Sequence, residues 1–275
     1  AESEANIPVL ETIAVSLLAS SQPIINASSQ TIIDLKRDTM WRRFASSPTV
    51  LAPQNVCLAR NPLWAIATGD ASVDSVLPGE RFPVIVRPVD SHAGDGLAKV
   101  NDEQLLHAYL ETRAEQLFYV APFIDYRGDD GRYRKYRIVF IAGLPFLVHL
   151  AISDSWMVHY LNAGMHEDAD KRAEEAECMI GFDENFGLRH SAALAQIAAQ
   201  VPLDYFAIDC AELRDGRLLL FEAGTGMIVH ALDSPALFPY KQRQMSRIFA
   251  AFIELLSSSA RTTSPRPAFV PCEKA

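Results

Sequence analysis

The chain has 275 residues and a mass of 30.4 kDa, enough for one large or two modest domains with substantial cores. Hydrophobic residues make up 49% and charged residues 21% of it, as in ordinary globular proteins, and the net charge of −9 argues against nucleic acid or an anionic membrane as a partner. No apolar run reaches the roughly 18 residues of a membrane span, and four scattered cysteines without a C-x-x-C pair indicate neither a zinc site nor a disulfide framework, so we expect a cytoplasmic protein.

The first 80 residues carry too few elements for a complete α/β domain. Short apolar pieces occur at 23–26 and 31–35, and a helix is predicted over 37–47. We interpret residues 1–80 as the truncated remnant of an N-terminal domain.

The predicted elements become regular after residue 81. A β-branched strand at 82–89 leads through a two-glycine loop to a helix over 100–113, with Asn101 as its N-cap, and to a strand over 115–125. Then come strands at 135–143 and 145–153, helices at 168–180 and 191–201, a hairpin at 205–224 and a closing helix at 240–256. Strands and helices interleave without regular alternation, which predicts an α+β fold with mostly antiparallel sheets. The Ser- and Pro-rich end, 259–275, is predicted to be an extended or mobile tail.

The hairpin raises a question of charge. Asp215-Gly216 suits a two-residue type I′ loop, and counting outward from it places Asp209 directly opposite Glu222. Opposed like charges on one face are destabilising, and the neighbours on that face are apolar. A shared proton, a nearby Lys or Arg, or a divalent cation could neutralise the pair, since carboxylates are hard ligands of Mg²⁺. A wet sheet edge or a plain salt-bridged pair is the alternative without function.

Three other segments carry candidate chemistry. Arg87 is followed by a flexible loop that could offer backbone N–H groups to a polyphosphate, although a two-glycine loop by itself is more often a plain hairpin turn. By alternation, Lys135 and Arg137 lie on one face of a strand, pointing into a cleft or forming a basic edge. His149 and His159 belong to an irregularly spaced group that does not suit a compact metal site.

The order of these features resembles the ATP-grasp superfamily over residues 82–232, in particular D-alanyl-D-alanine ligase and the ribosomal-protein glutamate ligases. The resemblance implies two α+β lobes with mostly antiparallel sheets that enclose the nucleotide. The small lobe, 81–125, would carry the glycine loop, and the large lobe, 126–258, the metal-binding hairpin. The N-terminal region looks truncated relative to the family, so a partner, a second subunit as in a homodimer, or a segment outside this chain could complete it.

The resemblance also implies roles for individual residues. The ATP phosphates and the nucleoside would be met by Arg87, Ser91, His92, Gly94, Gly96, Ala121, Phe123, Ile124, Asp125 and Lys135. Arg137 would be catalytic at the γ-phosphate, and Asp209 and Glu222 would bind Mg²⁺. Substrate contacts would come from His149, His159, Asn162, Lys171 and His230.

The implied activity is that of an ATP-dependent ligase. A small-molecule or peptide carboxylate would be activated as an acyl-phosphate and joined to an amine or similar nucleophile, with release of ADP and phosphate. Three positions depart from the family pattern: Arg87 replaces a common Lys, Ala121 replaces a common Glu, and Gly224 leaves the third metal ligand missing. An ATP-binding regulatory or scaffolding module without turnover is therefore the alternative, and a plain interaction protein is a further one.

Overall fold

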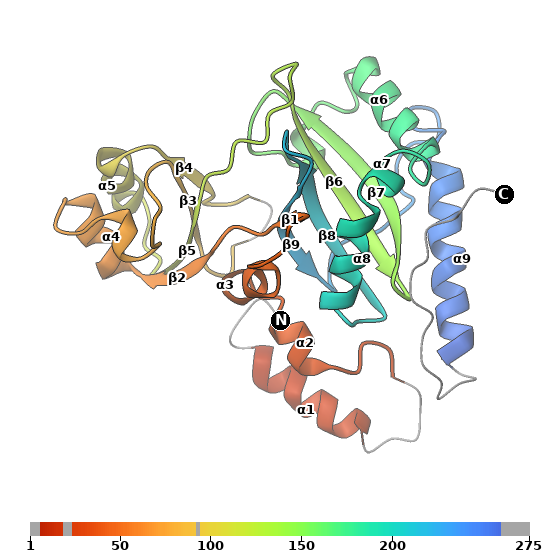
Figure 1. Cartoon of the computed structure of the whole chain (residues 1–275), viewed down its shortest axis with the longest axis horizontal. Coiled ribbons are helices and arrows are strands. Elements are labelled where there is room, and N and C mark those ends of the chain that lie inside the picture. Colours follow the sequence, from red (N-terminus) through yellow and green to blue (C-terminus); the bar gives the residue numbers. More distant parts are fainter. Residues whose placement is uncertain (1–5, 19–23, 92–93, 260–275) are drawn as a thin grey trace.

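Two sheets dominate the fold, one in each of two lobes (Figure 1). The computed structural model describes residues 6–18, 24–91 and 94–259. In the small lobe the strand order is β2-β5-β3-β4, with antiparallel pairing throughout: β2 Val56–Ala59, β3 Val84–Pro88, β4 Ala98–Val100 and β5 Leu117–Pro122. In the large lobe the order is β1-β9-β8-β6-β7, and only β1 with β9 is parallel: β1 Val50–Leu51, β6 Tyr133–Ile141, β7 Leu144–Ser153, β8 Tyr205–Glu212 and β9 Leu218–Gly224. The predicted α+β class is confirmed.

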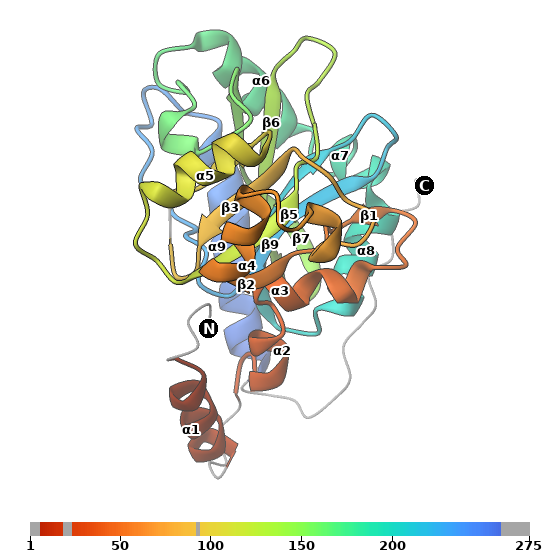
Figure 2. The same cartoon turned by 90° about the vertical axis from the view of Figure 1, so that its left-hand side faces the viewer.

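The small-lobe helices cover one face of their sheet and leave the other face open. These helices are α4 Arg60–Ala67 and α5 Glu103–Glu111, and Figure 2 shows them in front of β3 and β5. Side chains alternate along a strand, so Val84 and Val86 of β3 enter the core under the helices while Ile85 and Arg87 point the opposite way. The N-cap of α5 is Asp102, whose carboxylate accepts the Leu105 N–H at 2.8 Å, one residue after the predicted Asn101.

The first 80 residues do not form a separate region, which corrects the predicted boundary. Strand β1 from this part belongs to the large-lobe sheet and strand β2 to the small-lobe sheet. Residues of α4 share one hydrophobic core with β3 and β5. The remaining N-terminal elements are helices α1 Ile7–Leu18, α2 Ser29–Ile33 and α3 Arg37–Met40 and the 3-10 turns η2 Trp41–Phe44 and η3 Val73–Ser75. Leu35, Met40 and Phe44 lie in the core of the large lobe, so the segment around α3 is built into that lobe. Helix α1 extends away from both sheets in both views (Figures 1 and 2).

Both faces of the large sheet are covered, but one face only in part. The large-lobe helices are α6 Ala169–Ile180, α7 Phe186–Arg189, α8 Ser191–Gln200 and α9 Lys241–Ser259, and η4 Tyr160–Asn162 is a 3-10 turn. Ile138 and Phe140 of β6 pack into the core that α6, α7 and α8 close, while Val139 and Ile141 pack against α9. Because of the alternation, Lys135 and Arg137 lie on the same face as Val139, beyond the part that α9 covers.

The loop between β8 and β9 differs from the prediction. The Leu213 N–H donates to the Arg217 carbonyl at 2.9 Å, so the loop holds residues 214–216 and not Asp215-Gly216 alone. Gly216, at φ +85°, occupies the left-handed position that a three-residue hairpin loop requires. The register next to the loop is therefore shifted by one residue from the predicted one.

A bulge in β9 then restores the predicted pairing at the two acids. Cys210 pairs with Leu220 and Asp209 with Glu222, which leaves Phe221 as the extra residue. Leu219 pairs with Ala211 and therefore lies on the same face as Asp209 and Glu222. The longer loop and the bulge at Phe221 thus cancel each other, and Asp209 faces Glu222 as predicted.

No helix among the described residues is both long and apolar enough to cross a bilayer. The predicted tail at 259–275 lies outside the described residues except for Ser259, which ends α9.

A buried ion pair fastens the first turn of α9 to α6. Lys241 contacts Glu175 at 3.2 Å and Asp233 at 2.9 Å, and its side chain and that of Glu175 are 6% and 0% exposed. Glu175 also accepts hydrogen bonds from the Leu150 N–H and the Tyr240 hydroxyl. Burial raises the pKa of Glu175, while Lys241 acts in the opposite direction. The Glu175 carboxylate therefore lies where water could not replace Lys241 if that side chain were removed.

We expect Lys241→Ala to lower the free energy of unfolding by about 3–5 kcal/mol, because it leaves Glu175 buried without its cation. Arg247→Ala is the matched control on α9: its partner Asp183 is 2.6 Å away, but both side chains are largely exposed, so a loss of about 1 kcal/mol or less is expected. Urea denaturation at neutral pH measures both values. Equal losses in the two variants would contradict the role given to the buried pair.

Candidate functional site

The open faces of the two sheets enclose a cavity of about 800 Å³. Its walls come from β3 and β5 of the small lobe, from the segment that joins the lobes, from β6, β8 and β9 of the large lobe, and from α3. The charged side chains that line it are Lys36, Arg37, Arg87, Lys135, Arg137, Asp209 and Glu222. Five cations thus face two carboxylates, although the whole chain has a net charge of −9. This cavity is suited to a polyanion.

Four side chains form a row across the large sheet. The register pairs His149 with Arg137, Arg137 with Asp209, and Asp209 with Glu222, which brings β7, β6, β8 and β9 together at one level. Residues paired in this way lie on the same face of the sheet. The structure thus brings Arg137, Asp209 and Glu222 together, with His149 next to them.

Asp209 is held by two cations from β6. Arg137 forms two parallel hydrogen bonds to it, from Nε to Oδ1 at 2.7 Å and from an η-nitrogen to Oδ2 at 3.0 Å, and Lys135 Nζ lies 3.0 Å from Oδ2. Asp209 is 1% exposed. Burial by itself would raise the pKa of this carboxyl, but Lys135 and Arg137 outweigh burial and hold the pKa well below its usual range. Asp209 is thus a fixed anion that positions two cations at the cavity wall.

Glu222 has a cationic partner that the sequence analysis did not identify. Arg37, the first residue of α3, forms an ion pair with the Glu222 carboxylate, and the two side chains are 17% and 23% exposed. They are 185 residues apart in the chain, so no local pattern could have joined them. Of the three ways to neutralise the facing acids, the structure has the second, nearby Lys and Arg side chains.

The two acids fit a magnesium ion only in a restricted way. No group of three His, Cys, Asp or Glu side chains within 6–18, 24–91 and 94–259 could hold a metal ion, and Gly224 contributes no side chain to this site. One or two carboxylates are nevertheless sufficient when phosphate oxygens complete the octahedron of Mg²⁺. Asp209 and Glu222 therefore fit a single Mg²⁺ ion only if a phosphate ligand supplies the remaining oxygens.

The segment between the lobes supplies an apolar wall. Ala121, Phe123 and Ile124 line the cavity as predicted, and the Phe123 ring meets that of Trp156 edge to face at 5.8 Å. Such a wall suits a flat, uncharged ring. Asp125, one of the residues predicted to meet the nucleotide, is not among the lining residues: its carboxylate is bound by Arg127 and is 42% exposed.

The glycine loop divides into lining and structural residues. Gly94 lines the cavity with Arg87. The Ser91 hydroxyl donates to the Pro88 carbonyl at 2.8 Å and accepts from Arg87, so Ser91 shapes the loop. Gly96 is buried at φ +64°, and a Cβ there would lie 2.6 Å from the Pro88 ring, so it is required for the turn and does not line the cavity. His92 lies outside the described residues.

Two of the predicted substrate residues lie at the site. His159 lines the cavity, and its buried Nδ1 has no hydrogen-bond partner among the described residues. Burial and Lys135 lower its pKa. The His149 ring contacts that of Tyr160 in a tilted arrangement, with centroids 4.5 Å apart and an interplanar angle of 37°, and burial and Arg137 hold its pKa well below 6.5. Both imidazoles are therefore neutral near pH 7.

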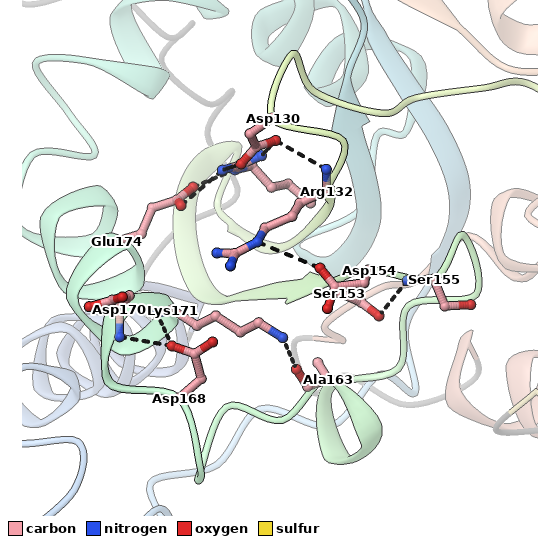
Figure 3. Close-up of polar contacts among 11 residues, drawn as sticks. Asp130, Arg132, Ser153, Asp154, Ser155, Ala163, Asp168, Asp170, Lys171 and Glu174 are labelled. Atoms are coloured by element: carbon pink, nitrogen blue, oxygen red, sulfur yellow. Dashed lines mark hydrogen bonds and ion pairs between the residues drawn. The ribbon is translucent and has the colours of Figure 1, made fainter.

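Like His149, the other three predicted substrate residues do not line the cavity. Lys171 is buried and donates to the Ala163 carbonyl at 2.7 Å, which ties α6 to the preceding loop (Figure 3). Asn162 and His230 are exposed, and His230 accepts the Leu232 N–H at 3.2 Å. These three residues were predicted from their residue type alone, and residue type does not indicate where in the fold a side chain lies.

Solved structures with a similar fold include two of a D-alanine–D-alanine ligase and one of an ATP-grasp protein. The D-alanine–D-alanine ligase of Bacillus anthracis aligns with 90% of this chain and 76% of its own, at 15% identity and a TM-score of 0.51. Its complex with ATP gives a TM-score of 0.49 at 16% identity over 90% and 75% of the two chains. A RimK domain ATP-grasp protein of Sphaerobacter thermophilus gives 0.48 at 17% identity, again over 90% and 75%. No model of a known protein family matches the chain, and no curated protein matches it in sequence.

We expect the neutral His149 to make folding sensitive to acid. Its pKa is depressed in the folded chain, so the unfolded chain binds a proton near pH 6.5 that the folded chain does not, and stability falls as the pH drops through that value. Between about pH 7.5 and about pH 5 this difference amounts to about 2 kcal/mol. The substitution His149→Phe keeps the ring and removes the titration, so its unfolding free energy should fall by about that much less over the same interval.

Urea denaturation at the two pH values checks this, with His230→Phe as the control because that ring is exposed. A His149→Phe variant that follows the wild-type pH profile would show that His149 is protonated as readily in the folded chain as in the unfolded one.

Proposed function

We propose that this chain, which has the ATP-grasp fold, is an ATP-dependent ligase that activates a carboxylate as an acyl-phosphate and joins it to an amine. The observation that carries the proposal is the cavity between the lobes. One wall is apolar, Ala121 to Ile124, and the opposite wall carries Lys135 and Arg137 on their buried anion Asp209. The adenine base of ATP would lie against the apolar wall, and its phosphates against the wall that carries Lys135 and Arg137.

The reaction would proceed in two displacements. An oxygen of the substrate carboxylate attacks the γ-phosphorus of ATP, the bond to the β-γ bridging oxygen breaks, and ADP leaves. The amine then attacks the acyl carbon, the bond between this carbon and the oxygen that joins it to phosphorus breaks, and inorganic phosphate leaves with that oxygen. Catalysis of such transfers consists mainly of positioning and charge neutralisation.

The residues of this chain would divide that work. Arg137 presents a planar fork of donors to the equatorial oxygens of the transferred group, and Lys135 adds a point charge. Asp209 orients both, because it binds Arg137 through two hydrogen bonds and contacts Lys135 at 3.0 Å. Mg²⁺ carried by the nucleotide, with Asp209 and Glu222 as its protein ligands, would supply further neutralisation of phosphate charge.

The nucleophile must lose a proton, and His159 is placed to take it. Its imidazole lines the cavity, and burial and Lys135 lower its pKa, which keeps the ring neutral. A neutral imidazole within the site can act as a general base. Gly94 and its loop would cover the phosphates and keep water from the acyl-phosphate.

A second candidate is an ATP-binding regulatory or scaffolding module without turnover. The missing side chain at Gly224 and the ion pairs on both acids favour it. Nucleotide binding without ADP release in the presence of any carboxylate would select this second candidate.

We expect Arg137→Gln to lower substrate-dependent ADP release from ATP by about 10²-fold or more, because it removes a donor aimed at the charge that develops in the transition state. The assay combines Mg·ATP with a panel of amino acids, dipeptides and small carboxylic acids. Arg134→Gln is the matched control: Arg134 lies on the same strand, pairs with Asp130 and Glu174, and is not among the lining residues. It should retain turnover within about twofold. Equal turnover in Arg137→Gln and Arg134→Gln would remove Arg137 from the reaction.

A further inference from the structure

We infer that Arg37 takes the place of a second metal ion at the phosphates, so that this chain holds its nucleotide with little dependence on divalent cations. The inference rests on the proposed nucleotide site and adds a residue to it. It starts from the charge of that site: Arg37, Lys135 and Arg137 already exceed Asp209 and Glu222 by one unit before any metal or nucleotide binds.

Arg37 is built into the cavity wall. Its helix, α3, contacts β9, and the flanking Leu35 and Met40 lie in the core of the large lobe. Its guanidinium meets Glu222 at 17% exposure, which removes most of the freedom of a surface arginine. A cation fixed in this way does not have to be ordered when a ligand arrives, so less affinity is lost to ordering.

The position that lacks a ligand lies on the same strand as Glu222, the partner of this arginine. Gly224 follows Glu222 by two residues and lies on the same face, since Ala207 pairs with Gly224 and Asp209 with Glu222. A Cβ at Gly224 would have no atom within 4 Å, and Gly224 is not among the glycines with positive φ. The fold therefore tolerates a side chain there, and the backbone gives no reason for glycine.

These observations fit the replacement of one metal ion by the guanidinium of Arg37. Without a ligand at 224, the pair Glu222 and Asp209 suits no more than one metal ion, and the guanidinium of Arg37 already supplies a positive charge to the Glu222 carboxylate. Arginine stays protonated at every physiological pH and forks onto phosphate oxygens, so it neutralises phosphate charge permanently. A divalent ion would do so only while bound.

The test measures binding of the non-hydrolysable ATP analogue AMP-PNP by calorimetry, in EDTA and in excess Mg²⁺. For wild type the Kd in EDTA should lie within roughly tenfold of the Kd in Mg²⁺. Arg37→Gln should widen that ratio by at least about tenfold. Adding Gly224→Asn to Arg37→Gln should lower the Kd in Mg²⁺ and leave the Kd in EDTA high, because it offers a metal ligand in place of the cation.

Arg42→Gln is the matched control, since Arg42 lies in the same segment, is exposed and does not line the cavity. It should follow wild type in both conditions. Thermal unfolding of each variant without ligand separates a folding defect from a loss of binding, and the double variant keeps the test decisive if Arg37→Gln is less stable.

The outcomes separate the two proposals. If wild type binds AMP-PNP only with Mg²⁺, and Arg37→Gln shows the same dependence, the inference is overturned while the ligase proposal stands. If wild type binds AMP-PNP in neither condition, the proposed nucleotide site itself is wrong. Binding in EDTA that is lost in Arg37→Gln supports the inference, whether or not a substrate for the ligase has been found.

Discussion

The contact of Asp209 with Arg137 and Lys135 determines what the rest of the site can do. A carboxylate that is 1% exposed has no water to solvate it, so its charge must be compensated by groups of the protein. Two cations on neighbouring strand positions provide this compensation and are fixed by it. Their common face on β6 becomes a rigid, positive wall, and the net positive charge of the cavity in an acidic chain follows from that arrangement.

The cavity exists because neither sheet is covered completely. In the small lobe the helices α4 and α5 cover one face of β3, which leaves Ile85 and Arg87 uncovered. In the large lobe α9 covers the Val139 end of β6 and leaves the Lys135 end open. Alternation along each strand turns these faces into one apolar and one charged wall, so the same period of two that builds the cores also builds the site.

The N-terminal segment has a larger part in the site than its irregular sequence suggests. It supplies an edge strand to each sheet and places Arg37 against Glu222. Without it the second carboxylate would lie at the cavity wall without that cation, and the two sheets would have no covalent connection besides the one after β5. This segment, which has little regular secondary structure, thus connects the two lobes and supplies the cation that pairs with Glu222.

The sequence by itself determined the fold class, most helices and strands, and the face shared by Lys135 and Arg137, because hydrophobic periodicity and turn residues act over short ranges. It also placed Asp209 opposite Glu222, although through a shorter loop than the real one, and the bulge at Phe221 compensated for that difference. The tertiary structure alone decided which cations meet those acids, that Gly96 serves the turn and Gly94 the cavity, and that Lys171 belongs to α6 rather than to the site. These outcomes depend on contacts between residues far apart in the chain and on which side of a sheet remains uncovered, and no local pattern encodes either.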